Sequence, residues 1–232
     1  MATRAKKVDV VFPPGAAEYA FFQTGTRGAE ALAEKYGRCE DAHRAVKYAR
    51  ELLPASVLEI GSGIGRASVY LHKVLGMGGV SFDLLDGNVG RKRAIKEAKR
   101  CAGTYGQLGE GYYNSLKVAR RYCEANGLLV GTYDAAEYGP GKKQIPESYH
   151  LVLSFKAVGF HWPVREYLEW LHDILLPGAL VIFEVRSHAT GMWEFTEDQI
   201  MTADGLVQAS KYGFVKVPSK REKFPLLVLS RT

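Results

Sequence analysis

Three closely spaced glycines between a short apolar segment and an expected helix constrain this fold more than any other feature. They lie in Glu59-Ile60-Gly61-Ser62-Gly63-Ile64-Gly65, with the apolar segment at 56–60 and the expected helix at 66–75. Glycine lets the backbone turn tightly and approach a ligand closely. The start of a helix adds free N–H groups and a positive dipole end, which suit a carboxylate or a phosphate. The run therefore predicts a strand–turn–helix unit with a ligand at the turn.

The rest of the chain alternates expected strands with expected helices. Strands are expected at 56–60, 80–85, 128–133, 149–155 and 179–185, and further helices at 112–125, about 164–174 and 199–211. The segments 213–217 and 226–230 can pair as a hairpin, which would add one antiparallel strand. Alternation of this kind predicts a mostly parallel sheet that is covered on both faces. We therefore expect one doubly wound α/β domain with a seven-stranded sheet, whose ligand crevice lies at the carboxyl ends of the strands.

The N-terminal quarter of the chain is expected to be helical. Residues 16–53 are broken at Gly25, Gly28 and Gly37, and Pro54 ends the segment because the residue before a proline avoids the helical region. We assign 1–53 to an N-terminal helical cap and 54–232 to the core of the same domain, with an insertion at about 89–111.

Composition narrows the class of protein. Three cysteines without paired spacing argue against a disulfide framework and a zinc cluster, so a metal-free site is expected. No apolar run reaches the ~18 residues of a membrane span, and the basic start at 1–9 is not followed by a signal core, so we expect a cytoplasmic protein that is not embedded in a membrane. The formal net charge of +6 is compatible with an anionic partner but does not require one.

Two other classes of nucleotide-binding protein do not match the glycine run. A dinucleotide-binding fingerprint needs G-x-G-x-x-G/A, but the third position is Arg66 in one register and Ser68 in the other. A phosphate-binding P-loop would require Gly-Lys-Ser/Thr, which does not follow. A plain tight turn is the remaining alternative without a ligand.

The segment 59–65 resembles the first motif of Rossmann-like (class I) S-adenosylmethionine-dependent methyltransferases, an acid followed by G-x-G-x-G after the first strand. The resemblance continues in order over 55–232. Residues 132–135 resemble the acidic turn after the third strand, 151–162 resemble the fourth strand and the loop after it, and Gly178 resembles the turn before the fifth strand. His150 departs from the family, in which many members carry an aspartate there.

The resemblance implies S-adenosylmethionine as the cofactor and assigns roles to residues. An acid at the end of the second strand would accept hydrogen bonds from the ribose hydroxyls, and of Asp83 and Asp86 we favour Asp86 because it ends the strand. Asp134 would contact the adenine amino group beside Ala135. The remaining implied residues shape the methionine pocket (Glu59, Gly61, Gly63, Gly65) or lie at the floor of the cofactor site (Ser154, Phe155).

Transfer of a methyl group to oxygen usually needs a base that takes the proton of the acceptor. His161, after the fourth strand, is our candidate, and His188 is a second one. The alternative for His161 is that it closes the pocket with Trp162 or packs against the next helix. Candidate substrate contacts are Phe22 and Arg27 in the aromatic N-terminal segment, together with Trp162 and His188; core packing by the aromatics and a solvated Arg27 are the alternative.

The insertion contains six basic residues within 91–100, on one side of an expected helix whose other side is apolar. They form either a contact for phosphate or a solvated face. The glycine-rich stretch 103–111 is either a lid or a connector.

Taken together, the sequence favours methylation of a small molecule, at oxygen, by a protein of unspecified oligomeric state. The acceptor can be anionic; nucleic acid is compatible but less favoured. The alternatives are an RNA or nucleotide methyltransferase and a non-catalytic cofactor-binding scaffold. The sequence carries neither the Asp/Asn-Pro-Pro-Tyr/Phe motif of amino-methylating DNA enzymes nor a Pro-Cys after the fourth strand.

Overall fold

The computed structural model describes residues 5–101, 114–155, 157–162, 164–184, 210–217 and 226–232. The helices are α1 (Ala16–Thr24), α2 (Ala29–Gly37), α3 (Glu40–Leu52), α4 (Arg66–Leu75), α5 (Arg91–Cys101), α6 (Leu116–Ala125) and α7 (Leu168–Ile174), with a 3-10 turn, η1 (Val164–Tyr167). The strands are β1 (Ser56–Ile60), β2 (Ser81–Asp86), β3 (Val130–Asp134), β4 (Tyr149–Ser154), β5 (Ala157–Trp162), β6 (Leu175–Glu184), β7 (Phe214–Val217) and β8 (Leu226–Arg231).

Seven of these strands form one sheet in the order β3-β2-β1-β4-β6-β8-β7. The pairs from β3 to β6 are parallel, whereas β8 runs antiparallel to both β6 and β7. The predicted seven-stranded, mostly parallel sheet with one antiparallel strand is therefore confirmed. Because β2 and β4 flank β1, the chain changes direction across the sheet there, and such a switch point opens a crevice at the carboxyl ends of the strands.

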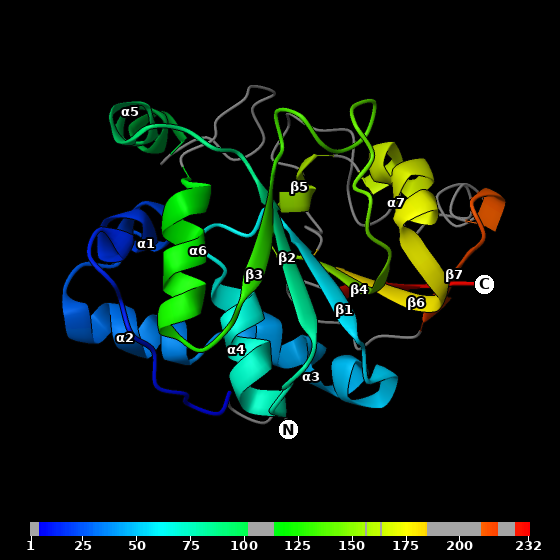
Figure 1. The fold of residues 1–232 in the computed structure, drawn as a ribbon, viewed down its shortest axis with the longest axis horizontal. Coiled ribbons are helices and arrows are strands. Elements are labelled where there is room, and N and C mark those ends of the chain that lie inside the picture. Colours follow the sequence, from blue (N-terminus) through cyan, green and yellow to red (C-terminus); the bar gives the residue numbers. More distant parts are fainter. Residues whose placement is uncertain (1–4, 102–113, 156, 163, 185–209, 218–225) are drawn as a thin grey trace.

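Helices cover the two faces of the sheet unequally (Figure 1). One core contains side chains from α1 to α4 and α6 packed on Val57, Leu84 and Leu153, and the other packs α7 and η1 on Leu58 and Val152. Consecutive residues of β1 thus enter opposite cores, as expected for a strand with period-two side chains that is buried on both faces.

The helices predicted for 16–53 are present as α1, α2 and α3. Gly25 and Gly28 separate the first two and both have positive φ angles, +68° and +89°. These helices share the core of the sheet, and Arg66 of α4 ties them down by donating to the carbonyl of Lys35 at 2.9 Å. The insertion begins as α5, which Figure 1 shows apart from the sheet. The stretch 102–113, which contains the glycine-rich segment expected as either a lid or a connector, lies outside the described residues.

Three expectations about the carboxyl half were wrong or imprecise. The turn expected at Pro177-Gly178 lies inside β6, where Leu175 pairs with Tyr149 and Leu180 with Leu151. Four residues of β6 (176–179) therefore lie opposite one residue of β4, so Gly178 (φ +77°) belongs to a bulge within the strand. Residues 157–162, expected as a loop, form β5 outside the seven-stranded sheet, and the helix expected at 164–174 begins as η1. The helix expected at 199–211 lies almost wholly outside the described residues.

In the part of the chain that the structure describes, no helix combines the length and the apolar character needed to cross a membrane.

Candidate active site

The three glycines adopt backbone conformations that other residues rarely accept. The φ angles of Gly61, Gly63 and Gly65 are +66°, +57° and +85°, all in the left-handed region. Space is limited as well, because a Cβ on Gly61 would lie 2.1 Å from the Cβ of Ala157, and one on Gly63 would lie 2.5 Å from Oε1 of Gln23. The turn between β1 and α4 therefore depends on glycine for both its conformation and its packing.

Glu59 lies beneath this turn and faces α4. Its side chain is buried, and its Oε2 accepts hydrogen bonds from the Ser68 backbone N–H at 3.0 Å and from the Ser68 hydroxyl at 2.6 Å. Burial raises the pKa of this carboxyl to about 7. Glu59 thus links the first turns of α4 to β1 by hydrogen bonds. It does not line the cavity described below.

Asp86, the last residue of β2, connects that strand to the glycine turn. Its Oδ2 accepts the backbone N–H of Gly63 and its Oδ1 accepts that of Gly87, both at 2.6 Å. Burial raises the pKa of Asp86 to about 7, against the opposing effect of these hydrogen bonds. The carboxyl end of β2 is thereby held against the turn after β1.

A cavity of about 210 Å³ lies at the carboxyl ends of β1 and β2. The loop after β3 forms a second wall, and the end of β5 with η1 forms a third. Of the residues singled out in the sequence, Gly61, Asp86, Ala135 and Trp162 come together here. The complete lining is Ile60, Gly61, Leu85, Asp86, Ala135, Tyr138, Gly139, Pro140, Lys142, Trp162, Glu166 and Tyr167.

Asp83 has different surroundings from Asp86. It pairs in register with Leu58 and Gly131, three residues before the end of β2, and its Oδ2 accepts the hydroxyl of Tyr149 at 2.8 Å. Burial raises its pKa. Asp83 does not line the cavity, so of the two candidate ribose ligands only Asp86 lies there.

Three other predicted cofactor residues, Asp134, Ser154 and Phe155, do not line the cavity and instead make contacts within the fold. Asp134 ends β3, and its Oδ1 accepts the Ala136 backbone N–H at 2.9 Å, while the Ala135 N–H donates to the Asp86 carbonyl at 2.9 Å. The buried Ser154 hydroxyl donates to the Ile60 carbonyl at 2.9 Å and accepts the Val158 N–H at 3.0 Å, so it joins the end of β1 to β5. Phe155 packs against the core beneath the helices.

The predicted catalytic and substrate residues are only partly brought to the cavity. His161 is the penultimate residue of β5 and directly precedes Trp162, which lines the cavity. Phe22 instead packs near Tyr19, with 5.6 Å between ring centroids, and the exposed Arg27 lies over the Phe21 ring at 5.3 Å. Neither lines the cavity, and His188 lies outside the described residues.

Known structures share this architecture. The O-MT region (residues 961–1257) of StiE superposes with a TM-score of 0.58 at 15% identity, covering 100% of this chain and 86% of that one. CalS10, an amino pentose methyltransferase from Micromonospora echinaspora, gives 0.54 at 13% identity, covering 98% and 100%. This chain has the fold of the class I S-adenosylmethionine-dependent methyltransferases. Human N-acetylserotonin methyltransferase gives 0.53 at 12% identity, covering 94% of this chain and 56% of that one. No protein-family model and no curated protein matches the sequence.

On this methyltransferase fold, several residues that were not predicted from the sequence contact the glycine turn or line the cavity, and of these only Gln23 lies in a segment that had a signal, the aromatic N-terminal segment. Gln23 accepts the Ile64 backbone N–H at 3.4 Å, and Nδ2 of Asn114 donates to the Gly63 carbonyl. Tyr138, Lys142, Glu166 and Tyr167 join the lining of the cavity. No spacing rule could have placed them, because each belongs to a segment that tertiary packing brings to the turn or to the strand ends.

Proposed function

We propose that this protein is an S-adenosylmethionine-dependent methyltransferase that transfers the methyl group to an oxygen of a small molecule. The observation that carries the proposal is that the glycine turn and Asp86 meet at one cavity, which Gly61 and Asp86 both line. A turn of three left-handed glycines follows β1, and Asp86 at the end of the neighbouring strand binds the central glycine of that turn.

The residues at the cavity fit the cofactor in three respects. Each oxygen of Asp86 accepts one backbone N–H, and a carboxylate oxygen has a second lone pair for a ribose hydroxyl. The backbone at Gly61 faces the cavity without a side chain, which permits close approach. The side chains of Ala135 and Tyr138 offer apolar and aromatic surfaces for the purine ring, and Asp134, which precedes Ala135 in the chain, would contact its amino group.

When bound, the cofactor supplies an electrophilic methyl group on a sulfonium. The contribution of the chain is then to align the acceptor and to take up its proton. We assign the base to His161, since β5 carries its backbone to the wall of the cavity. Trp162 and Tyr167 would border the acceptor and exclude water from it.

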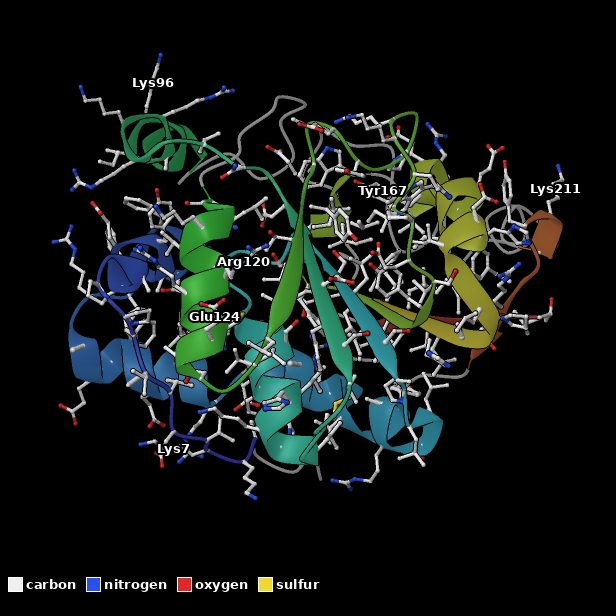
Figure 2. All side chains as sticks on the ribbon, in the orientation of Figure 1. Lys7, Lys96, Arg120, Glu124, Tyr167 and Lys211 are labelled. Carbon is white, nitrogen blue, oxygen red and sulfur yellow. The ribbon has the colours of Figure 1, made fainter. Side chains whose placement is uncertain are left out.

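A second candidate is an RNA or nucleotide methyltransferase, and α5 favours it. Arg91, Lys92, Arg93 and Lys96 are all exposed on this helix, and Figure 2 shows Lys96 pointing away from the rest of the molecule. A basic face of this kind attracts phosphate. Arg91 is engaged, however, in a two-point ion pair with Glu18 of α1 at 2.8 Å for each contact. The small-molecule acceptor remains our main proposal because the cavity, not this surface, adjoins Asp86.

The test compares two aspartates of one strand. Asp86→Asn removes the charge next to the glycine turn, and Asp83→Asn makes the same change away from the cavity. We expect calorimetry with S-adenosylhomocysteine to show about 10-fold or more weaker binding for Asp86→Asn and nearly unchanged binding for Asp83→Asn. Thermal melts of both variants check that they fold.

A second measurement separates the classes of acceptor. Radiolabelled methyl from the cofactor, incubated with cell extract, should appear in the small-molecule fraction. Label in RNA, together with an RNA affinity that falls steeply with salt, would favour the second candidate. Absence of cofactor binding to the wild-type protein would refute the proposal, and binding without transfer to any fraction would favour a scaffold.

A further inference from the structure

Two carboxamide side chains meet at the middle glycine of the turn. Gln23, near the end of α1, lies so close to Gly63 that its carboxamide atoms would be 2.5–2.6 Å from a Cβ built there. Asn114, two residues before α6, is 2% exposed and donates from Nδ2 to the Gly63 carbonyl. Neither residue was predicted from the sequence, although Gln23 lies in the aromatic N-terminal segment, and both contact the same residue that Asp86 binds.

Backbone partners fix the orientation of both carboxamides. The N–H of Ile64 can only donate, so the atom of Gln23 that faces it at 3.4 Å is the oxygen, which also accepts the Tyr36 hydroxyl at 2.9 Å. The Gly63 carbonyl can only accept, so the atom of Asn114 that faces it is the nitrogen. Each carboxamide therefore has one end bound to the protein and a defined opposite end.

The two opposite ends have complementary hydrogen-bonding character. Nε2 of Gln23, a donor, and Oδ1 of Asn114, an acceptor, are buried and have no partner among the residues that the structure describes. Buried polar atoms are nearly always paired in folded proteins, because leaving them unpaired is costly. The site therefore suits a ligand group that offers an acceptor and a donor together.

We propose that Gln23 and Asn114 bind the α-amino-acid end of the cofactor, with the carboxylate accepting from Nε2 of Gln23 and the ammonium donating to Oδ1 of Asn114. This inference rests on the proposed function and extends it to two residues outside the glycine run. A zwitterion supplies both kinds of group on one carbon, and the nearby start of α4 favours the carboxylate. Asp86, Gln23 and Asn114 all contact Gly63, so in this proposal they would bind neighbouring parts of one ligand, the ribose and the amino-acid end.

The decisive variant is Gln23→Glu. It keeps the oxygen that accepts from Tyr36 and Ile64 and replaces only the free donor with an anionic oxygen, which would repel a carboxylate. Gln23→Met removes the donor without adding charge, in case the new carboxylate prevents folding. Gln144→Glu makes the same charge change at an exposed residue that does not line the cavity, and is the matched control.

Calorimetry is carried out with two ligands: S-adenosylhomocysteine, which has the amino-acid end, and methylthioadenosine, which lacks it. We expect the wild-type protein and Gln144→Glu to prefer S-adenosylhomocysteine. Gln23→Glu should weaken its binding by about 10- to 100-fold and leave methylthioadenosine unaffected. Gln23→Met should show a smaller loss with the same selectivity.

Other outcomes overturn the inference in distinguishable ways. If both Gln23 variants keep the wild-type preference, the free atoms are bound to water, and only this inference fails. If the variants weaken both ligands equally, Gln23 supports the turn without reading the amino-acid end, and again only this inference fails. If the wild-type protein binds neither ligand, the proposed function itself fails.

Discussion

Replacement of Glu59 by Gln should make the cofactor-free protein more stable at alkaline pH and leave it unchanged at acidic pH. Glu59 is 3% exposed, and one oxygen, Oε2, accepts both hydrogen bonds from Ser68. A glutamine of the same shape keeps an oxygen for these donors. What it removes is a carboxyl group that ionises while buried.

The sign follows from the direction of the pKa shift. Burial raises the pKa of Glu59 from 4.5 to about 7; the negative charge of Asp86 adds to the increase, and the hydrogen bonds from Ser68 and the charge of Arg66 oppose it. The folded protein then holds a proton more tightly than the unfolded chain does. The contribution of Glu59 to the free energy of unfolding is therefore fully present below pH 4.5 and is lost as the pH rises to about 7. At about 1.4 kcal/mol for each pH unit, the complete interval corresponds to about 3 kcal/mol.

Urea unfolding of both proteins between pH 5 and pH 8 measures this difference. We expect the free energy of unfolding of Glu59→Gln, relative to wild type, to grow by about 2–3 kcal/mol over that range. Asp86 titrates in the same interval but is present in both proteins, so its contribution largely cancels. Parallel pH profiles for the two proteins would show that Glu59 stays ionised in the fold, and the reasoning from burial would be refuted.

Two further sets of substitutions probe contacts around the site. Gly76→Ala should lower the free energy of unfolding by about 1–2 kcal/mol, because Gly76 has a φ of +62° but lies in open space. Gly61→Ala, at a φ of +66°, should cost clearly more because the new Cβ would collide with Ala157, and Ala157→Gly should restore part of the loss. Urea unfolding measures both costs, and equal costs at the two glycines would contradict the close packing. Tyr149→Phe should cost about 1–3 kcal/mol by removing the donor to Asp83, and much less in an Asp83→Ala background, which has no acceptor for the hydroxyl. A double-mutant cycle with no coupling would contradict that contact.

The order of elements could be predicted because it depends on local patterns. Continuous apolar runs marked β4 and β6, and glycines marked the limits of α1 and α2. The bulge in β6 could not be predicted, because Pro177-Gly178 has the composition of a turn and only pairing with β4 reveals that the strand continues through it. The same limit applies to β5, which sequence patterns alone did not distinguish from a loop.

The residues of the candidate site likewise fall into those that local sequence patterns predict and those that they do not. Asp86 could be favoured over Asp83 because the end of a parallel strand lies at the crevice. In the structure Asp86 lines the cavity and Asp83 does not, and the role of Asp86 as ribose ligand stays a prediction. Gln23 and Asn114 could not be found, because the turn that they contact lies 41 and 51 residues away in the chain. Contacts at such separations follow from how α1 and α6 pack on the sheet, and no local pattern encodes them.

Gly63 is consequently the point where three separate parts of the chain meet. Gln23 comes from the N-terminal helices, Asp86 from β2, and Asn114 from the segment that leads into α6, and each contacts the same residue. The cofactor side of the proposed site is thus held by several hydrogen bonds and close contacts at one glycine. Another wall of the cavity is formed by the end of β5 and η1, where Glu166 is exposed. Substitutions there disturb fewer buried contacts, so the choice of acceptor can vary on this wall while the binding of the donor stays constant.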